Sequence, residues 1–170
     1  GEINLKIEGT IPVSALDSCP YCCRFSKTYS KALISARIRH LLLCASGRPV
    51  VTHVWNESKG KTVHLPALPQ PDAIRDLNEL IKCYETGHKH PLPFFPHASF
   101  DAYPYTHKNW VNSAKNSFNS PFFGGGDWVD PDVQKVFQPE DFNDPDFTVE
   151  FAQTGKVFFQ FVSEGGLKDD

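Results

Sequence analysis

The sequence predicts a mixed α/β fold of the α+β type, and two kinds of apolar periodicity in its 170 residues carry this prediction. Short segments with an apolar residue at every second position are typical of half-buried strands. Longer segments with apolar residues three or four positions apart are typical of helices that bury one side. The content of 40% hydrophobic and 13% aromatic residues indicates a globular chain rather than a disordered one.

Four segments have the pattern of strands. Residues 3–7 alternate apolar and polar side chains, and Cys22–Tyr29 is expected to form a second strand. Val50–Trp55 is short and β-branched, and Thr62–Leu65 is expected to pair with it through a turn at Lys59–Lys61. The predicted sheet therefore includes a hairpin.

Lys31–Ala45 is expected to form a basic helix, because Ile34, Ile38 and Leu41 fall on one side of it. Gly47, followed by a proline two residues later, is expected to end this helix.

A second helix is expected to begin at Pro71, because proline is favoured in the first turn, and to end at Gly87. Its buried side is expected to comprise Ile74, Leu77, Leu80 or Ile81, and Tyr84.

Several elements are expected in the remaining chain. The proline- and phenylalanine-rich stretch Pro91–Tyr105 is predicted to be an irregular packed connection. Thr106 is expected to cap a helix that carries Trp110, Ala114 and Phe118. Asp130 is expected to cap a short helix, and Asp146–Phe161 is expected to be a helix that Gly155 weakens. Of the three tryptophans, Trp128 is expected to be exposed, since its loop is rich in glycine.

The chain contains no internal repeat and no linker-like segment, so residues 1–170 are expected to form a single domain. No apolar run is long enough to predict a membrane span. Five cysteines, an odd number without a secretory signal, favour free thiols in a reducing compartment and hence a cytoplasmic location.

The charge of the chain is unevenly distributed. A net charge of -3 argues against a strong non-specific nucleic-acid binder on bulk charge alone. However, no acidic residue occurs between Asp17 and Glu57, where six lysines and arginines lie, so a local basic face is one interpretation. Ordinary solvated faces with chance clustering are the other. The six basic residues are Arg24, Lys27, Lys31, Arg37, Arg39 and Arg48.

Three segments, taken in their order along the chain, resemble the C-terminal region of RecC-type subunits of exodeoxyribonuclease V. They are Ile38–Gly47 (IRHLLLCASG), Leu80–Phe94 (LIKCYETGHKHPLPF), and Trp128–Phe137 before a phenylalanine-rich end (VFFQF). The order of strand, strand, basic helix, strand and helix supports the same resemblance, which implies that the chain is a C-terminal fragment of a larger RecC-like subunit.

This resemblance implies a restriction-endonuclease-like nuclease core that is catalytically degenerate, with extra C-terminal helices. Nucleases of this class hold Mg²⁺ with one Asp in a Gly-x-Ile-Asp pattern and another in Asp-x-Lys about a dozen residues later. Here the first pattern ends in Pro12, and the second has Phe25 in place of the acid, with Lys27 retained. We therefore expect no catalytic residue, no metal, no cofactor and no hydrolytic activity.

The resemblance further implies a non-catalytic DNA-binding and assembly domain of the RecBCD helicase and nuclease complex, acting in double-strand break repair and recombination. The implied partners are RecB-like and RecD-like subunits and double-stranded DNA ends. The residues expected to contact DNA phosphates are Arg24, Lys27, Lys31, Arg37 and Arg39. A purely structural subunit-interaction domain without DNA contact remains an alternative.

Cys19-Pro20-Tyr21-Cys22 suggests a second alternative, a glutaredoxin-like thiol oxidoreductase. Such a motif should follow a strand and open a helix, and a loop with a cis proline should accompany it. No Thr-Val-Pro tripeptide is present, so a shaped turn is the other interpretation. The same two cysteines have the spacing of zinc ligands, but no second pair follows at finger-like spacing.

Overall fold

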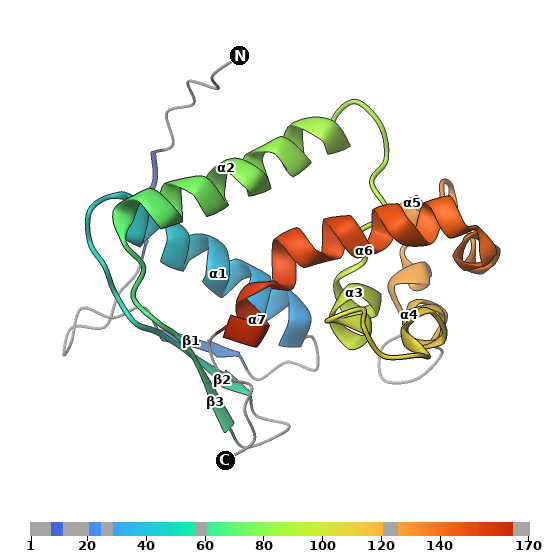
Figure 1. Ribbon diagram of the computed structural model, residues 1–170, viewed down its shortest axis with the longest axis horizontal. Helices are drawn as coiled ribbons and strands as arrows, with labels where there is room; N and C mark the ends of the chain where they lie inside the picture. The colour runs from blue at the N-terminus through green and yellow to red at the C-terminus, as the bar shows by residue number, and fades with distance from the viewer. Residues whose placement is uncertain (1–7, 12–20, 25–28, 57–60, 121–125, 165–170) are drawn as a thin grey trace.

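The computed structural model describes residues 8–11, 21–24, 29–56, 61–120 and 126–164. The strand predicted over residues 3–7 lies outside this part of the chain. The described residues form an α+β fold, with a small sheet at one end and helices over the rest (Figure 1).

The elements alternate early in the chain and become helical later. The strands are β1 (Tyr21–Arg24), β2 (Thr52–Asn56) and β3 (Lys61–Leu65). The α-helices are α1 (Tyr29–Ala45), α2 (Gln70–Gly87), α3 (Pro96–Ala102), α4 (Trp110–Phe118), α5 (Pro131–Gln134), α6 (Pro145–Phe159) and α7 (Phe161–Glu164). Two short 3₁₀ helices are η2 (Asp127–Val129) and η3 (Pro139–Asn143).

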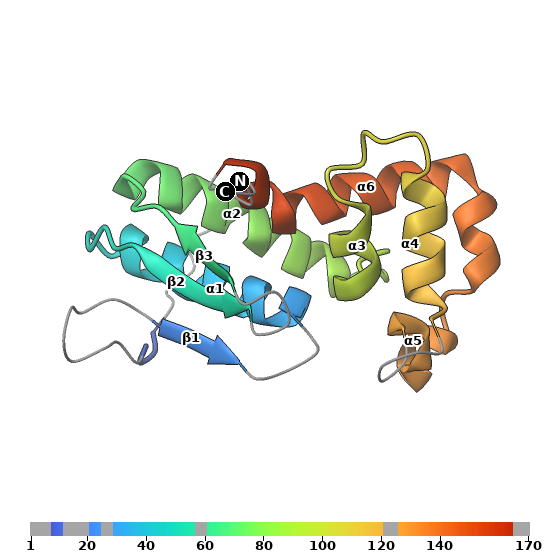
Figure 2. The same cartoon turned by 90° about the horizontal axis from the view of Figure 1, so that it is seen from below.

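The sheet has the order β1-β2-β3 and lies along one edge of the molecule (Figure 2). β1 runs parallel to β2, and α1 makes the crossover that a parallel pair requires. β2 and β3 pair antiparallel, which confirms the predicted hairpin. Of the strand predicted over Cys22–Tyr29, Cys22–Arg24 pair with β2 and Tyr29 belongs to α1 instead, while residues 25–28 lie outside the described residues.

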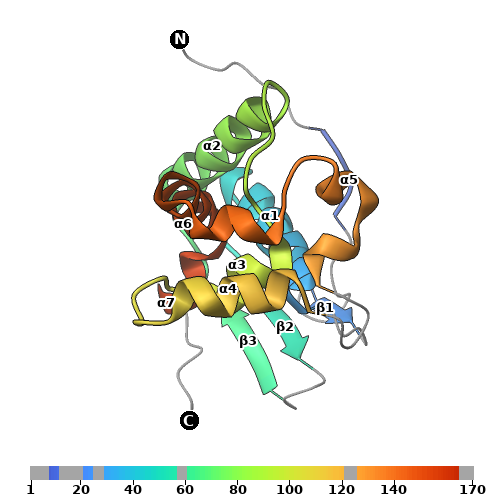
Figure 3. The same cartoon turned by 90° about the vertical axis from the view of Figure 1, so that its right-hand side faces the viewer.

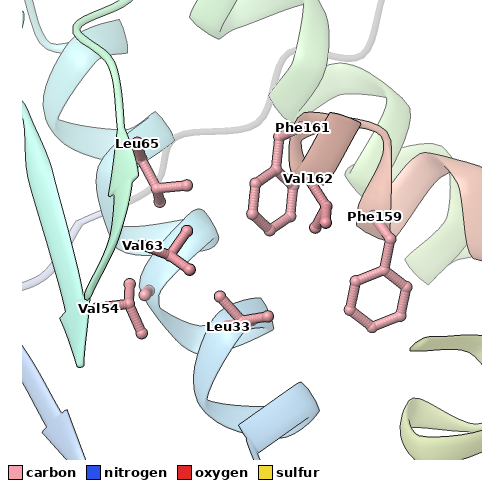
Figure 4. Packing of buried hydrophobic residues seen from close by; sticks show 8 residues of the cluster. Leu33, Val54, Val63, Leu65, Phe159, Phe161 and Val162 are labelled. Carbon is pink, nitrogen blue, oxygen red and sulfur yellow. The ribbon is translucent and has the colours of Figure 1, made fainter. Parts of the chain in front are cut away.

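Helix α1 packs between the sheet and α2 (Figure 3). Its buried side chains meet the inward-facing residues of β2 and β3, while the end of α6 and α7 close the same core (Figure 4). This core contains Leu33, Ala36, Val54, Val63, Leu65, Phe159, Phe161 and Val162. The C-terminal residues therefore complete a core that the first half of the chain begins.

Helix α1 ends as predicted. Gly47 has φ +82°, a conformation that glycine adopts without steric cost. Its backbone N–H donates to the Cys44 carbonyl at 3.1 Å, and the Arg48 N–H donates to the Leu43 carbonyl at 3.1 Å. These bonds satisfy carbonyl groups that the helix end leaves open.

Helix α2 contains Pro71 and Asp72 in its first turn, as expected. Its predicted buried side is confirmed for Leu77 and Leu80, which pack beside α1, and is wrong for its two ends. Ile74 and Tyr84 are 43% and 68% exposed, whereas Ala73 is fully buried against α1. The reason is that α2 meets α1 along the stripe that starts at Ala73, where a small side chain lets the two helices approach closely.

A second core joins α3, α4, η3 and α6 and is built mainly from aromatic rings. Its fully or almost fully buried rings are Phe95, Phe118, Phe142 and Phe151. Ring centroids in this cluster lie 4.5 to 6.4 Å apart in mostly tilted and edge-on pairs, the geometry that aromatic quadrupoles favour.

Two predictions for this half are wrong. Pro91–Tyr105 is not irregular throughout, because Pro96 takes the first helical position of α3, where its missing N–H costs nothing. Thr106 is exposed and does not cap α4, which begins at Trp110 after Asn109.

The predicted cap of α5 is confirmed. The carboxylate of Asp130 accepts a hydrogen bond from the Asp132 N–H at 2.9 Å.

Gly155 was expected to weaken α6, but the structure shows a packing role for it. The hydroxyl of Tyr105 donates to the Ser99 carbonyl at 2.9 Å and lies against the α6 backbone. A Cβ atom at Gly155 would lie 1.8 Å from that hydroxyl oxygen. Glycine here permits the close approach of α6 to the second core.

Arg37 links α1 to α2 and α7. Its guanidinium donates to the carboxylate of Asp76 in α2, and the two side chains are only 9% and 13% exposed. Its Cζ atom also lies 4.9 Å from the ring centroid of Phe161, a cation–π contact. The buried side chain of Arg37 in α1 therefore contacts both α2 and α7.

His40 is fully buried between α1 and β2. Its Nδ1 atom lies 3.0 Å from the Thr52 hydroxyl, and its Nε2 atom lies 3.8 Å from the Cys44 sulfur. Burial, together with the nearby positive charge of Arg37, lowers the pKa of His40 to about 4. The imidazole is therefore neutral in the folded protein at neutral pH.

We predict that Gly155→Ala lowers the free energy of unfolding by about 1–3 kcal/mol, because the new methyl group collides with Tyr105. The same change in an unobstructed helix would stabilise it by up to about 1 kcal/mol. Urea unfolding measures the difference, with Gln153→Ala at an exposed position of α6 as the control, which should change stability by about 0.5 kcal/mol or less. A neutral or stabilising Gly155→Ala contradicts this packing.

We predict that Arg37→Ala lowers the free energy of unfolding by at least about 2 kcal/mol, because it leaves the carboxylate of Asp76 largely buried beside one remaining arginine. Arg39→Ala, two positions along the same helix and exposed, is the matched control and should change stability by less than about 0.5 kcal/mol. Equal effects of the two changes in urea unfolding would contradict the buried role of Arg37.

We predict that acid destabilises the protein through His40. The folded-state pKa is depressed from 6.5 to about 4, so the stabilisation is complete above pH 6.5 and is lost as the pH falls through 4. The loss amounts to about 3 kcal/mol over this window. Unfolding at several pH values tests it: His40→Gln should flatten the curve, whereas His88→Gln, at an exposed position, should not. The same pH slope in wild type and His40→Gln would rule it out.

Candidate nucleic-acid interface

The predicted DNA contacts on α1 separate into two groups. Lys31 and Arg39 are exposed, and so is Arg48 just beyond the helix. Arg37 points the other way and is 7% exposed, engaged with Asp76 and Phe161. Because successive helical residues are about 100° apart, Lys31 and Arg39 share a face that excludes Arg37. The structure therefore disfavours Arg37 as a phosphate ligand.

Of the other two predicted contacts, the structure describes only the position of Arg24. Arg24 is the last residue of β1 and pairs in register with Asn56, which in turn pairs with Lys61. This places two basic residues in one row across the sheet. Lys27 lies outside the described residues, so its prediction has no structural outcome.

The predicted nuclease positions Pro12, Phe25 and Lys27 also lie outside the described part of the chain. Among the residues that the structure does describe, no group of three or more His, Cys, Asp or Glu side chains is placed to hold a metal ion. Cys19 is not described, and Cys22 lies within strand β1 rather than at the start of a helix. A redox motif of the glutaredoxin type would open a helix.

The sheet presents a ring-rich outer face that sequence reasoning missed. In β2 and β3, Thr52, Val54, Val63 and Leu65 are buried, while the alternate residues point away from α1. Trp55 is 38% exposed, and the rings of His53 and His64 meet edge-on with centroids 4.6 Å apart. The alternation of buried and ring-bearing residues in β2 could have indicated this face.

The buried carboxylate of Asp127 accepts hydrogen bonds from the N-terminal end of α3. It accepts hydrogen bonds from the backbone N–H groups of His97 at 3.0 Å and Ala98 at 2.9 Å, in the first turn of α3. Burial raises the pKa of Asp127, and these bonds and the charge of Lys31 oppose the rise.

The neighbouring Trp128 was expected to be exposed, but this prediction is wrong. Trp128 is half-buried and packs on the second core, with its indole N–H enclosed.

An apolar cavity of about 390 Å³ lies between α1, α2 and α6. Its lining includes Ile38, Tyr84 and Phe158, and the thiol of Cys83, whose pKa is raised by burial and by the charge of Glu79. The sequence does not predict this cavity, because its pattern predicts a buried Tyr84, whereas Tyr84 is exposed and lines the cavity. A cavity lined by apolar side chains suits association with another apolar surface rather than acid–base chemistry.

The comparisons with known proteins give one family. None of the helices in the described ranges is long and apolar enough to cross a membrane. A search of curated proteins found no match. The family model described as the RecC C-terminal domain matches residues 3–105, more than half of the chain, and includes the sheet, α1, α2 and α3. The chain therefore belongs to the RecC C-terminal domain family.

Proposed function

We propose that this chain is a non-catalytic DNA-binding and assembly domain of an exodeoxyribonuclease V complex, acting in double-strand break repair and recombination. Its partners in this proposal are RecB-like and RecD-like subunits and the ends of double-stranded DNA. Membership of the RecC C-terminal domain family supports the place in the complex. The observation that supports DNA contact is the exposed basic face of α1 in a stretch without acidic residues.

In this proposal the fold is a nuclease-like core that has lost its catalytic acids, in a single domain. The order of strand β1, basic helix α1 and strand β2, with β1 and β2 parallel, agrees with the resemblance on which the proposal rests. The replacement of carboxylates by Pro12 and Phe25 removes the ligands that a pair of Mg²⁺ ions requires. The domain therefore serves binding rather than hydrolysis.

The DNA contacts in this proposal are Arg24, Lys27, Lys31 and Arg39, without Arg37. Lysine and arginine side chains that reach phosphates neutralise them irrespective of the base sequence. The contacts are therefore sequence-independent and weaken as salt rises. Arg37 is assigned a structural role instead, because its guanidinium is buried against Asp76.

The assembly role is supported by the apolar surface around the cavity between α1, α2 and α6. Tyr84 of α2 lines this cavity and is 68% exposed, and Ile38 of α1 lines it and is 37% exposed. Exposed apolar patches of this kind mark interaction surfaces in many proteins.

We predict that Lys31→Ala and Arg39→Ala each reduce the slope of log binding constant against log salt for duplex DNA by about one unit. The reason is that binding releases one counterion fewer for each phosphate contact that is removed. Binding at several salt concentrations measures the slopes, with Lys82→Ala as a charge-matched control on α2, where Lys82 pairs with Glu79. Unchanged slopes in both α1 variants would remove these residues from the interface and favour an assembly domain without DNA contact.

We also predict that the purified chain does not cleave linear DNA in the presence of Mg²⁺. Without two carboxylates at the nuclease positions, no pair of ligands is available to hold the metal ion beside the phosphate. Incubation with linear duplex and gel analysis tests this. Cleavage that depends on Mg²⁺ and survives further purification would contradict the proposal.

A further inference from the structure

Two histidines face each other across the β2–β3 hairpin. His53 of β2 pairs in register with His64 of β3, so the two side chains leave the sheet on the same face. The residues next to them along both strands are buried, which directs the imidazoles to the outer face, away from α1. These buried neighbours are Thr52, Val54, Val63 and Leu65. His53 is half-buried and His64 is exposed, so solvent reaches the pair.

The separation of the two rings is that of imidazoles bound to one metal ion. The ring centroids of His53 and His64 lie 4.6 Å apart, with the ring planes at 88°. Metal–nitrogen bonds of about 2.0–2.1 Å place the centroids of two imidazoles on one zinc ion about 4.5–5.2 Å apart. The two histidines therefore have the spacing of a metal-bound pair.

The chemistry of the ligands defines the class of ion. Imidazole suits borderline divalent ions such as Zn²⁺, Ni²⁺ and Cu²⁺, whereas Mg²⁺ and Ca²⁺ prefer oxygen ligands. Across the described ranges of the chain, no group of three or more His, Cys, Asp or Glu side chains is placed to hold a metal ion. A site at this pair therefore has two protein ligands, and water completes its tetrahedral coordination.

We propose that His53 and His64 bind a zinc ion that joins β2 to β3. The inner face of the hairpin prepares the site, because the buried side chains of Val54 and Val63 fix the strand register from the core side (Figure 4). The two rings meet before the ion arrives, which lowers the entropic cost of binding. Three further residue pairs lie between the histidines and the connection of the two strands, so the ion ties the hairpin at its far end.

The zinc site goes beyond the proposed function and does not depend on it. The nuclease site that the sequence predicts to be lost would have held Mg²⁺ through carboxylates, whereas this site uses imidazole nitrogens. Cys19 and Cys22 also have the spacing of zinc ligands. The experiment must therefore separate the histidine pair from the cysteine pair.

The experiment is a calorimetric titration of the metal-free full chain with zinc chloride. His53→Gln and His64→Gln should each weaken zinc binding at least about 10-fold, because each removes one of two protein ligands. His88→Gln is the matched control, since it removes an exposed imidazole whose Nδ1 atom lies 3.1 Å from the Tyr84 carbonyl oxygen, and it should leave binding unchanged. Cys19→Ser breaks the cysteine pair and should leave binding at the histidines unchanged. An excess of magnesium chloride should not displace the zinc.

Thermal unfolding with and without zinc chloride is the second measurement. An ion that binds only the folded hairpin raises the unfolding midpoint of the wild type. His64→Gln, at an exposed position, should fold with an unchanged circular dichroism spectrum and should show no such rise.

Four results overturn the zinc site. They are no saturable binding by the wild type, equal binding by the wild type and both histidine variants, which would leave an adventitious ion only, loss of all binding in Cys19→Ser, and a midpoint that zinc shifts equally in the wild type and His64→Gln. The salt slopes of Lys31→Ala and Arg39→Ala for duplex DNA test the proposed function separately. Failure of the zinc site would leave those slopes as they are, and unchanged slopes would leave the zinc site in place.

Discussion

The arrangement of the helices depends on the buried contact of Arg37 with Asp76 and Phe161. A guanidinium that is almost withdrawn from water is stable only where a carboxylate and further contacts replace its hydration. This requirement fixes the rotation of α1, because Arg37 must face α2 and α7. The same rotation directs Leu33 and Ala36 to the sheet and exposes Lys31 and Arg39. The position of one buried charge thus determines which basic residues of α1 remain exposed.

The family match ends at residue 105, yet the later residues are part of the same structure. Phe159, Phe161 and Val162 complete the core formed by α1 and the sheet, and Gly155 lets α6 approach Tyr105 closely. A C-terminal segment that fills a core in the matched region has little independence from it. A single domain over residues 1–170 stays a prediction, with which these contacts agree.

Local signals made part of the fold predictable. The apolar periodicity and Gly47 predicted helix α1 and its end, and Asp130 predicted the N-cap of α5. These features could be recognised because they act within a few residues of the chain. The predictions that were wrong concern residues whose positions depend on contacts between segments far apart in the sequence. Whether Arg37 reaches DNA depends on Asp76, which lies 39 residues away, and the buried side of α2 depends on how closely it approaches α1. For the candidate site, the acid-free stretch was visible in the sequence, but the outer face around Trp55 required the strand register.

The central claim is that this chain is a binding and assembly domain of an exodeoxyribonuclease V complex. The most direct measurement is co-purification of the full chain with RecB-like and RecD-like subunits from the same genome, with and without forked DNA. We predict a stable stoichiometric complex that retains the fork, weakened by substitution of Tyr84 at the exposed rim of the apolar cavity. A folded chain that associates with neither subunit under either condition would contradict the claim.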